Sequence, residues 1–229
     1  MEKRGPALDR YDKVFIVIGS AGAAIFLLGL MWYLLDVPHG SDRALLDAIR
    51  GLRAPPLTVL FYAFSVLGNK YLLLALGVLF IAHLLLKRKY RLGAELYLLF
   101  CFLWSLNLAM KALFSRERPG EDGLLLDAIG GSFPSGHAMV GNALWGTIVI
   151  YVFHMRTGYF PWAIAAWSLL AILMCISRVY LGVHYPSDVI AGLGLSCVFM
   201  AIVYRILRNE RAKATERDHG PRTNTRIGP

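Results

Sequence analysis

Six long apolar runs divide the chain, and each is near the length that crosses a bilayer as a helix. Spanning the hydrocarbon core takes about 20 mostly apolar residues in a helix. The pattern predicts spans at 14–35, 71–86, 92–114, 138–153, 162–176 and 189–207. Another apolar run, 57–67, is separated from the second span by Gly68-Asn69-Lys70. We expect it to form a short helix that dips into the bilayer or lies along it.

Composition agrees with this pattern. Of 229 residues, 57% are hydrophobic and 17% charged, and the charges cluster between the apolar runs. This excludes an ordinary cytosolic fold, a disordered chain and a disulfide scaffold, and it makes nucleic acid an unlikely partner for the net charge of +9. The predicted fold is an all-α polytopic membrane bundle of six transmembrane helices, spanning residues 14–208.

The positive charges predict the orientation, since cytoplasmic loops are enriched in Lys and Arg. With the N-terminus inside, sixteen of the 24 Lys and Arg face the cytoplasm. Residues 1–13 and a disordered basic tail, 209–229, are then both cytoplasmic. The first run is longer than a signal-peptide core and no small-residue cleavage pattern follows it, which favours an uncleaved anchor.

Three polar segments fall on the outer side of this topology, which is drawn without reference to them. They are Lys-Ala-Leu-Phe-Ser-Arg-Glu-Arg-Pro at 111–119, Phe-Pro-Ser-Gly-His at 133–137, and Ser-Arg-Val-Tyr-Leu-Gly-Val-His-Tyr-Pro-Ser-Asp at 177–188. Ionisable groups at the ends of membrane spans are costly and often functional. The three segments therefore predict one functional site.

The cations in these segments have two interpretations. Lys111 could snorkel to the headgroups, and Arg118 and Arg178 could be interfacial anchors or pair with nearby acids. Three cations converging on one pocket, however, need an anion between them. Arg presents a planar fork that suits phosphate oxygens, and Lys acts as a point charge. A phosphate site accounts for all three.

Ser135, Gly136 and His137 begin an apolar helix. Ser135 could simply be its N-cap. The free N–H groups of a helix start also form an anion site, with His137 beside it. His184 and Asp188, four residues apart, could cap a helix locally, or the carboxylate could fix the imidazole tautomer and leave one nitrogen as a nucleophile or ligand.

Phosphoryl transfer is the chemistry that uses all these groups. A serine-hydrolase triad lacks the GxSxG elbow and leaves the cations without a role. A metal site of His137, His184 and Asp188 is disfavoured because three neighbouring cations repel a divalent metal. A cationic cradle with two histidines suits a phosphoryl group instead.

The three segments resemble the tripartite signature of the type 2 phosphatidic acid phosphatase family, and no motif position departs from it. The resemblance implies that His184 attacks phosphorus to form a phosphohistidine, that Asp188 orients it, and that His137 protonates the leaving oxygen and then activates water. It implies phosphate binding by a larger group, namely Lys111, Arg118, Arg178, Ser135 and the Gly136 N–H. It also implies no metal and no cofactor.

An active site on the outer face suits a membrane lipid phosphate as substrate, and we expect no obligate protein partner. The family resemblance implies undecaprenyl diphosphate, phosphatidylglycerol phosphate or phosphatidic acid. Residues 121–132 are expected to influence the choice. Segment 41–53 has apolar residues at helical spacing and predicts a short interfacial amphipathic helix, either covering the bundle or bordering the lipid entry route. A lipid-linked phosphotransferase and a lipid binder or transporter without turnover are the alternatives.

Overall fold

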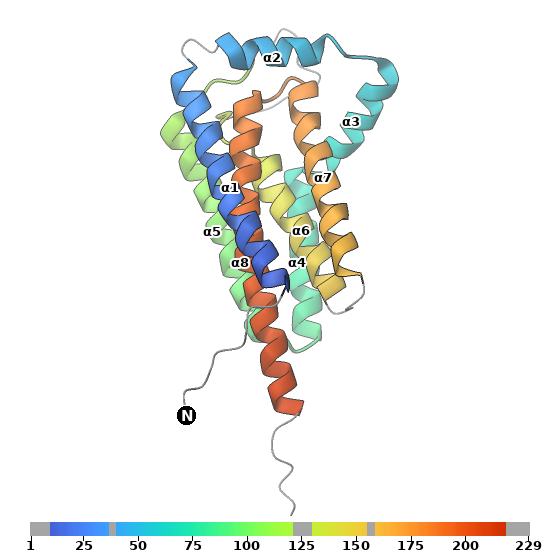
Figure 1. Cartoon of the computed structure of the whole chain (residues 1–229). Coiled ribbons are helices and arrows are strands. Elements are labelled where there is room, and N and C mark those ends of the chain that lie inside the picture. The colour runs from blue at the N-terminus through green and yellow to red at the C-terminus, as the bar shows by residue number, and fades with distance from the viewer. Residues whose placement is uncertain (1–9, 37–39, 121–129, 155–158, 219–229) are drawn as a thin grey trace, which may run out of the picture.

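The computed structural model describes residues 10–36, 40–120, 130–154 and 159–218, and within them every regular element is a helix. Figure 1 shows long helices running side by side, with a short one across one end of the bundle. The elements are α1 (Arg10–Leu35), α2 (Gly40–Arg50), α3 (Pro55–Leu67), α4 (Lys70–Leu86), α5 (Tyr90–Phe114), the π-helical turn η1 (His137–Gly141), α6 (Asn142–His154), α7 (Phe160–Tyr180) and α8 (Pro186–Asp218).

Four of these helices, α1, α5, α7 and α8, are long and apolar enough to cross a membrane. Helices α3 and α4 pass the same test together, across a bend of 45°, and the apolar helix His137–Phe153 is shorter. The outward sides of the bundle are apolar: Leu28, Leu79 and Leu98 are each about two-thirds exposed. A surface of this kind is stable against hydrocarbon and not against water. The fold is therefore a helical, multi-pass membrane bundle.

Helix α1 packs closely along α8 (Figure 1). A Cβ atom on Gly22 would lie 2.6 Å from Cβ of Cys197, and one on Gly29 would lie 2.6 Å from the Ala191 nitrogen. Only glycine permits this approach. Gly22 and Gly29 of the first predicted span thus serve close packing inside the bundle.

Helix α2 lies across the end of the bundle at which α7 ends and α8 begins (Figure 1). The Asp36 carboxylate accepts hydrogen bonds from the backbone N–H groups of Ser41 and Asp42, at 2.9 and 3.0 Å, which caps the helix start. Leu46 on its inner side is fully buried. After α2, Arg53 Nε donates to the Tyr180 carbonyl oxygen at 2.9 Å and joins the connection to α7.

Two boundaries differ from the sequence prediction. Helix α8 continues to Asp218, so the part of the predicted tail at 209–218 is helical; residues 209–217 are mostly helix formers such as Glu, Arg, Ala and Lys. Residues 177–180, expected in a connection, form the last turn of α7. The rest of the tail, like residues 1–9, lies outside the described residues.

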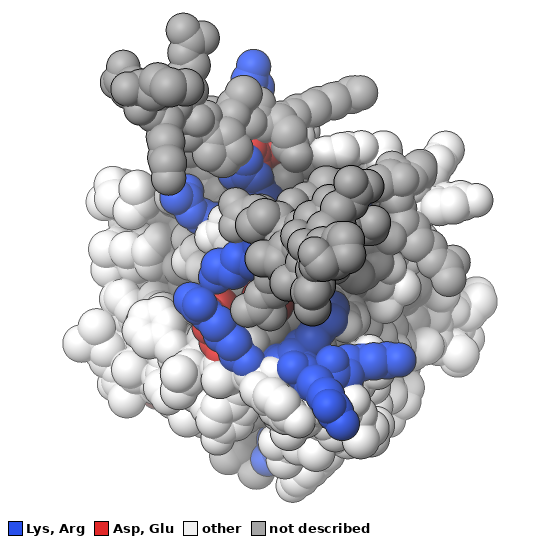
Figure 2. Space-filling model, turned by 90° about the horizontal axis from the view of Figure 1, so that it is seen from below, with Lys and Arg blue, Asp and Glu red and all other residues white. Residues whose placement is uncertain are grey.

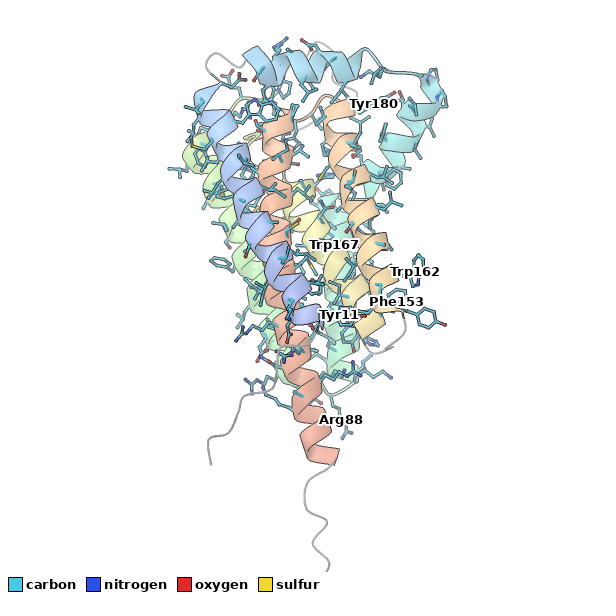
Figure 3. The ribbon with its side chains drawn as sticks, viewed as in Figure 1. Tyr11, Arg88, Phe153, Trp162, Trp167 and Tyr180 are labelled. Atoms are coloured by element: carbon cyan, nitrogen blue, oxygen red, sulfur yellow. The ribbon has the colours of Figure 1, made fainter. Side chains whose placement is uncertain are left out.

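The two ends of the bundle differ in character. In Figure 3, Tyr180 lies near α2, whereas Tyr11 and Arg88 lie at the opposite end. Figure 2 looks onto that opposite end and shows Lys and Arg side chains gathered there. They include the exposed Lys87, Arg88 and Arg91 around the α4–α5 turn. The basic end and the α2 end are therefore separated by the length of the bundle.

Candidate active site

The three predicted segments meet at the α2 end of the bundle. Arg178 lies in the last turn of α7, His184 in the connection that follows, and Asp188 in the first turn of α8. The connection is a tight turn in which Gly182 has φ +82°, and the Val183 N–H donates to the Arg178 carbonyl at 3.1 Å. This left-handed turn favours glycine and brings His184 back beside Asp188.

His184 and Asp188 form a buried pair. His184 Nδ1 lies 3.3 Å from Asp188 Oδ2, which also accepts a hydrogen bond from the Tyr185 N–H at 2.9 Å. The Ser132 hydroxyl donates to the same oxygen. An imidazole that donates from Nδ1 to the carboxylate keeps its lone pair on Nε2. In this tautomer Nε2 is the ring atom that can accept a bond from a ligand.

Arg118 lies next to that atom. Its Nη1 is 3.3 Å from His184 Nε2 and donates to the Val183 carbonyl at 2.7 Å, while its Nε donates to the Gly130 carbonyl at 3.0 Å. Burial, followed by the positive charges of Arg118, Lys111 and Arg178, lowers the pKa of His184 well below its usual value. Burial likewise lowers the pKa of Arg118, and Asp188 opposes this shift. A neutral His184 is thereby favoured at neutral pH.

The other two cations reach the site from separate helices. Lys111, near the end of α5, donates to the Gly131 carbonyl. Arg178 is 5% exposed and donates from Nη1 to the Ser65 hydroxyl on α3, and its buried Nε has no hydrogen-bond partner among the described residues. Burying like charges together is unfavourable without an anion to neutralise them. The arrangement suits a bound phosphate.

Ser135 does not cap the helix that follows it. Its hydroxyl is fully buried and has no hydrogen-bond partner in the part of the chain that the structure describes. Its backbone N–H donates to the Asp188 carbonyl at 3.0 Å, and Asn107 Nδ2 supports the segment by donating to the Pro134 carbonyl at 3.3 Å. The Phe133–Pro134 peptide bond is cis. The N-cap interpretation is therefore wrong, and the hydroxyl is available for another partner.

His137 begins the π-helical turn and lies over the break between α3 and α4. Its Nε2 lies 3.1 Å from the Ser65 carbonyl oxygen. A Cβ atom on Gly68 would lie 2.1 Å from His137 Cδ2, so the ring sits directly against the backbone of this break. The Gly68-Asn69-Lys70 interruption thus makes room for a site residue.

The structure also adds residues that the sequence did not distinguish. Arg116 joins Asp188 to Asp42 on α2, and Ser132 and Ser65 contact the two histidines. Arg116 lies in the segment 111–119, where the sequence assigned it no role, and Ser65 lies within the apolar run 57–67. None of the three sequence segments includes Asp42. Of the segment expected to influence substrate choice, residues 121–129 lie outside the described residues.

One hollow adjoins this region, and a second lies further along the bundle. A pocket of about 320 Å³ is lined by Lys111, Ser115, Arg116, Glu117, Gly130 and Gly131. A larger groove of about 840 Å³ lies along α4 and α5, and most of its lining is apolar, including Leu74, Val78, Phe100 and Trp104. The first is large enough for a polar headgroup, and the second suits a hydrocarbon chain.

Comparison with known proteins identifies the family of this chain. Residues 94–212 match the model of the PAP2 superfamily. The chain is 31% identical over 170 residues to phosphatidylglycerophosphatase B of Bacillus subtilis, covering 72% of this chain and 82% of that protein. It is 27% identical over 200 residues to the lipid A 4'-phosphatase of Porphyromonas gingivalis, covering 80% and 78%.

A solved structure is similar as well. The fold superposes with a TM-score of 0.73 on the crystal structure of a transmembrane PAP2-type phosphatidylglycerolphosphate phosphatase from Bacillus subtilis, at 27% identity, covering 83% of this chain and 96% of the other. The chain belongs to the PAP2 superfamily and is a membrane lipid phosphatase, a hydrolase acting on phosphate esters.

Proposed function

We propose that the protein removes a phosphate from a lipid phosphate or diphosphate through a phosphohistidine on His184, without a metal ion. The observation that carries this proposal is the surrounding of His184: Asp188 lies at Nδ1, and the Arg118 guanidinium lies 3.3 Å from Nε2. A nucleophile held between a carboxylate and a cation can attack an anionic phosphorus centre.

In the first step the lone pair of His184 Nε2 attacks phosphorus. The N–P bond forms and the P–O bond to the lipid breaks, and its electron pair leaves with the oxygen. His137 donates a proton to this oxygen. Because its Nε2 faces a carbonyl, which only accepts hydrogen bonds, Nε2 carries a hydrogen and Nδ1 is the atom that exchanges the proton.

In the second step water attacks the phosphohistidine. His137 Nδ1 takes a proton from the water, the N–P bond breaks, and its electron pair returns to Nε2, which releases inorganic phosphate. Lys111, Arg118 and Arg178 hold the phosphate oxygens, together with the Ser135 hydroxyl and the Gly136 N–H. These cations offset the charge that divalent metals neutralise in other phosphoryl-transfer enzymes.

The proposal also includes a membrane topology. Six spans, with α3 entering the membrane beside α4, place both termini in the cytoplasm and the site on the outer face. Two observations support this orientation: the site lies at the α2 end, and the basic end shown in Figure 2 lies opposite. The amphipathic helix α2 then lies in the interface above the site, at the level of lipid headgroups.

The substrate is a glycerophospholipid phosphate or a polyprenyl diphosphate. The names of the two relatives, a phosphatidylglycerophosphatase and a lipid A phosphatase, support a lipid phosphate. The apolar groove along α4 and α5 supports a substrate with a long hydrocarbon chain. We propose phosphatidylglycerol phosphate or undecaprenyl diphosphate as the preferred substrate.

The test is phosphate release by the purified protein in detergent micelles. The panel contains phosphatidylglycerol phosphate, undecaprenyl diphosphate and phosphatidic acid, each with and without candidate acceptors. His184→Ala should abolish release, and the control His83→Gln, on an exposed position of α4, should not. Release that requires an acceptor would indicate a phosphotransferase. Wild-type release by His184→Ala would overturn the proposed nucleophile.

A further inference from the structure

Arg116 links Asp188, the partner of His184, to helix α2. We propose that Arg116 is a positioning residue, which clamps Asp188 in its orientation toward His184 and ties it to Asp42 on α2. The inference rests on the proposed function, because it assigns Arg116 an effect on the proposed nucleophile. It adds α2 to the catalytic framework.

The Arg116 guanidinium divides its hydrogen bonds between two carboxylates. Its Nη1 donates to Asp188 Oδ1 at 2.5 Å and to the Ser187 hydroxyl at 2.7 Å, while Nη2 donates to Asp42 Oδ2 at 2.7 Å. Asp42 Oδ1 in turn accepts the Ser187 N–H at 3.0 Å. Arg116 thus holds the oxygen of Asp188 that does not face His184.

Burial strengthens these hydrogen bonds, so they fix how α2 and Asp188 are placed. Asp42, Ser187 and Asp188 are fully buried, and Arg116 is 4% exposed. Charge-assisted hydrogen bonds are short and directional, and they are weakly screened away from water. The pairing therefore fixes the position of α2 relative to the first turn of α8.

Two tyrosines fix the plane of the guanidinium. The Arg116 Cζ atom lies 4.6 Å from the ring centroid of Tyr33 on α1 and 4.2 Å from that of Tyr185. Stacking of this kind and a divided hydrogen-bond fork are available to arginine and not to lysine. Arg116→Lys should therefore keep the positive charge but lose the hydrogen-bond geometry.

The backbone of Arg116 also supports the His184–Asp188 pair. Its carbonyl accepts the Ser132 N–H at 2.8 Å, and the Ser132 hydroxyl donates to Asp188 Oδ2. One residue thereby supports both oxygens of Asp188, one directly and one through Ser132. Residues that orient a catalytic ligand in this way typically change activity about 10–100-fold when they are replaced.

The first test compares Arg116→Gln with wild type. We expect kcat to fall about 10–100-fold with little change in KM, because the Arg116 side chain is only 1% exposed beside the pocket and bonds to carboxylates. Arg116→Lys should recover only part of the loss. A structural role alone would lower the melting temperature but leave kcat per folded molecule unchanged.

The pH profile provides the sharper readout. His184 is faced by Asp188, Arg118, Lys111, Arg178 and His137. Removing the charge of Arg116 from behind Asp188 favours the protonated forms of Asp188 and His184, so the acid limb of kcat/KM should move to higher pH. Asp42→Asn removes a negative charge from the same network and should move the limb to lower pH. Ionisation of the substrate affects all variants equally, so it cancels when their pH profiles are compared.

The matched controls lie on α2, the helix that also carries Asp42. Arg43 and Asp47 form an exposed pair on α2, 3.7 Å apart, with both side chains about half exposed. Arg43→Gln and Asp47→Asn should leave kcat and the acid limb unchanged. If Arg116→Gln does not fold, the shift in Asp42→Asn still tests the proposal.

The outcomes separate the two proposals. Unchanged kcat and pH profiles in Arg116→Gln or Asp42→Asn, with an active wild type and an inactive His184→Ala, would overturn the role of Arg116 alone. A His184→Ala variant that still releases phosphate would instead overturn the proposed function. Shifts in opposite directions for the two network variants are the expected result.

Discussion

Gly68 lies directly beneath the imidazole ring of His137: a Cβ atom on this glycine would lie 2.1 Å from His137 Cδ2 and 2.6 Å from Cγ. Real Cβ atoms do not approach other atoms this closely, so any side chain there displaces the ring. The break between α3 and α4 is therefore a constraint on the proposed general acid as well as a feature of the fold.

Gly68→Ala should lower kcat about 100-fold, because a shift of about 1 Å in a reacting group has an effect of this size. Gly93→Ala on α5 is the control, since a Cβ atom there makes only ordinary contacts with the Leu84 and Leu85 side chains, at 3.7 and 3.8 Å. Steady-state kinetics on a lipid phosphate, normalised to folded protein, provide the comparison. Equal kcat values for the two variants would contradict the placement of His137 in the reaction.

Ser135→Ala tests the unpartnered hydroxyl. The variant loses no hydrogen bond within the structure, so its melting temperature should not fall. Its affinity for vanadate should drop about 10–100-fold, the range expected for one hydrogen bond to a charged group. Ser196→Ala on α8 is the control, because that hydroxyl already donates to the Leu193 carbonyl at 2.8 Å. Unchanged vanadate affinity in Ser135→Ala would remove the hydroxyl from the phosphate site.

Arg118→Gln should move the acid limb of kcat/KM to higher pH. Burial and the Arg118 charge both lower the pKa of His184. The imidazole therefore stays neutral at pH values below the usual histidine pKa of about 6.5. Without the cation the pKa of His184 rises, so protonation removes the nucleophile at a higher pH. Comparing pH profiles of wild type and variant with one substrate measures the shift. A shift toward lower pH would contradict the charge relationship.

Vanadate should inhibit competitively with the lipid phosphate, because it occupies the same cationic cradle of Lys111, Arg118 and Arg178. A chelator should leave phosphate release unchanged. Both effects are measured on the purified protein with inorganic phosphate as the readout. Activity that is lost with the chelator and restored by a divalent cation would overturn the metal-free mechanism.

The sequence by itself was sufficient for the membrane class and for selecting most residues of the candidate site. Long apolar runs must be helical in a bilayer, because only a helix satisfies its own backbone there, and so the helical bundle followed from hydropathy. The spacing within 111–119, 133–137 and 177–188 singled out His184, Asp188 and the three cations. Of these, Asp188 is four residues from His184 on a local turn, which sequence spacing can reveal.

Only the tertiary structure showed which further residues contact the candidate site, namely Arg116, Asp42, Ser132 and Ser65. Arg116 and Asp42 are 74 residues apart, and their hydrogen bond depends on α2 lying across the end of the bundle. Sequence periodicity reports which face of a helix is apolar, but not the element on which that face packs. Partners that are distant in the chain are set by packing. The candidate reactive groups were therefore readable from the sequence, and the contacts that hold them were decided by the fold.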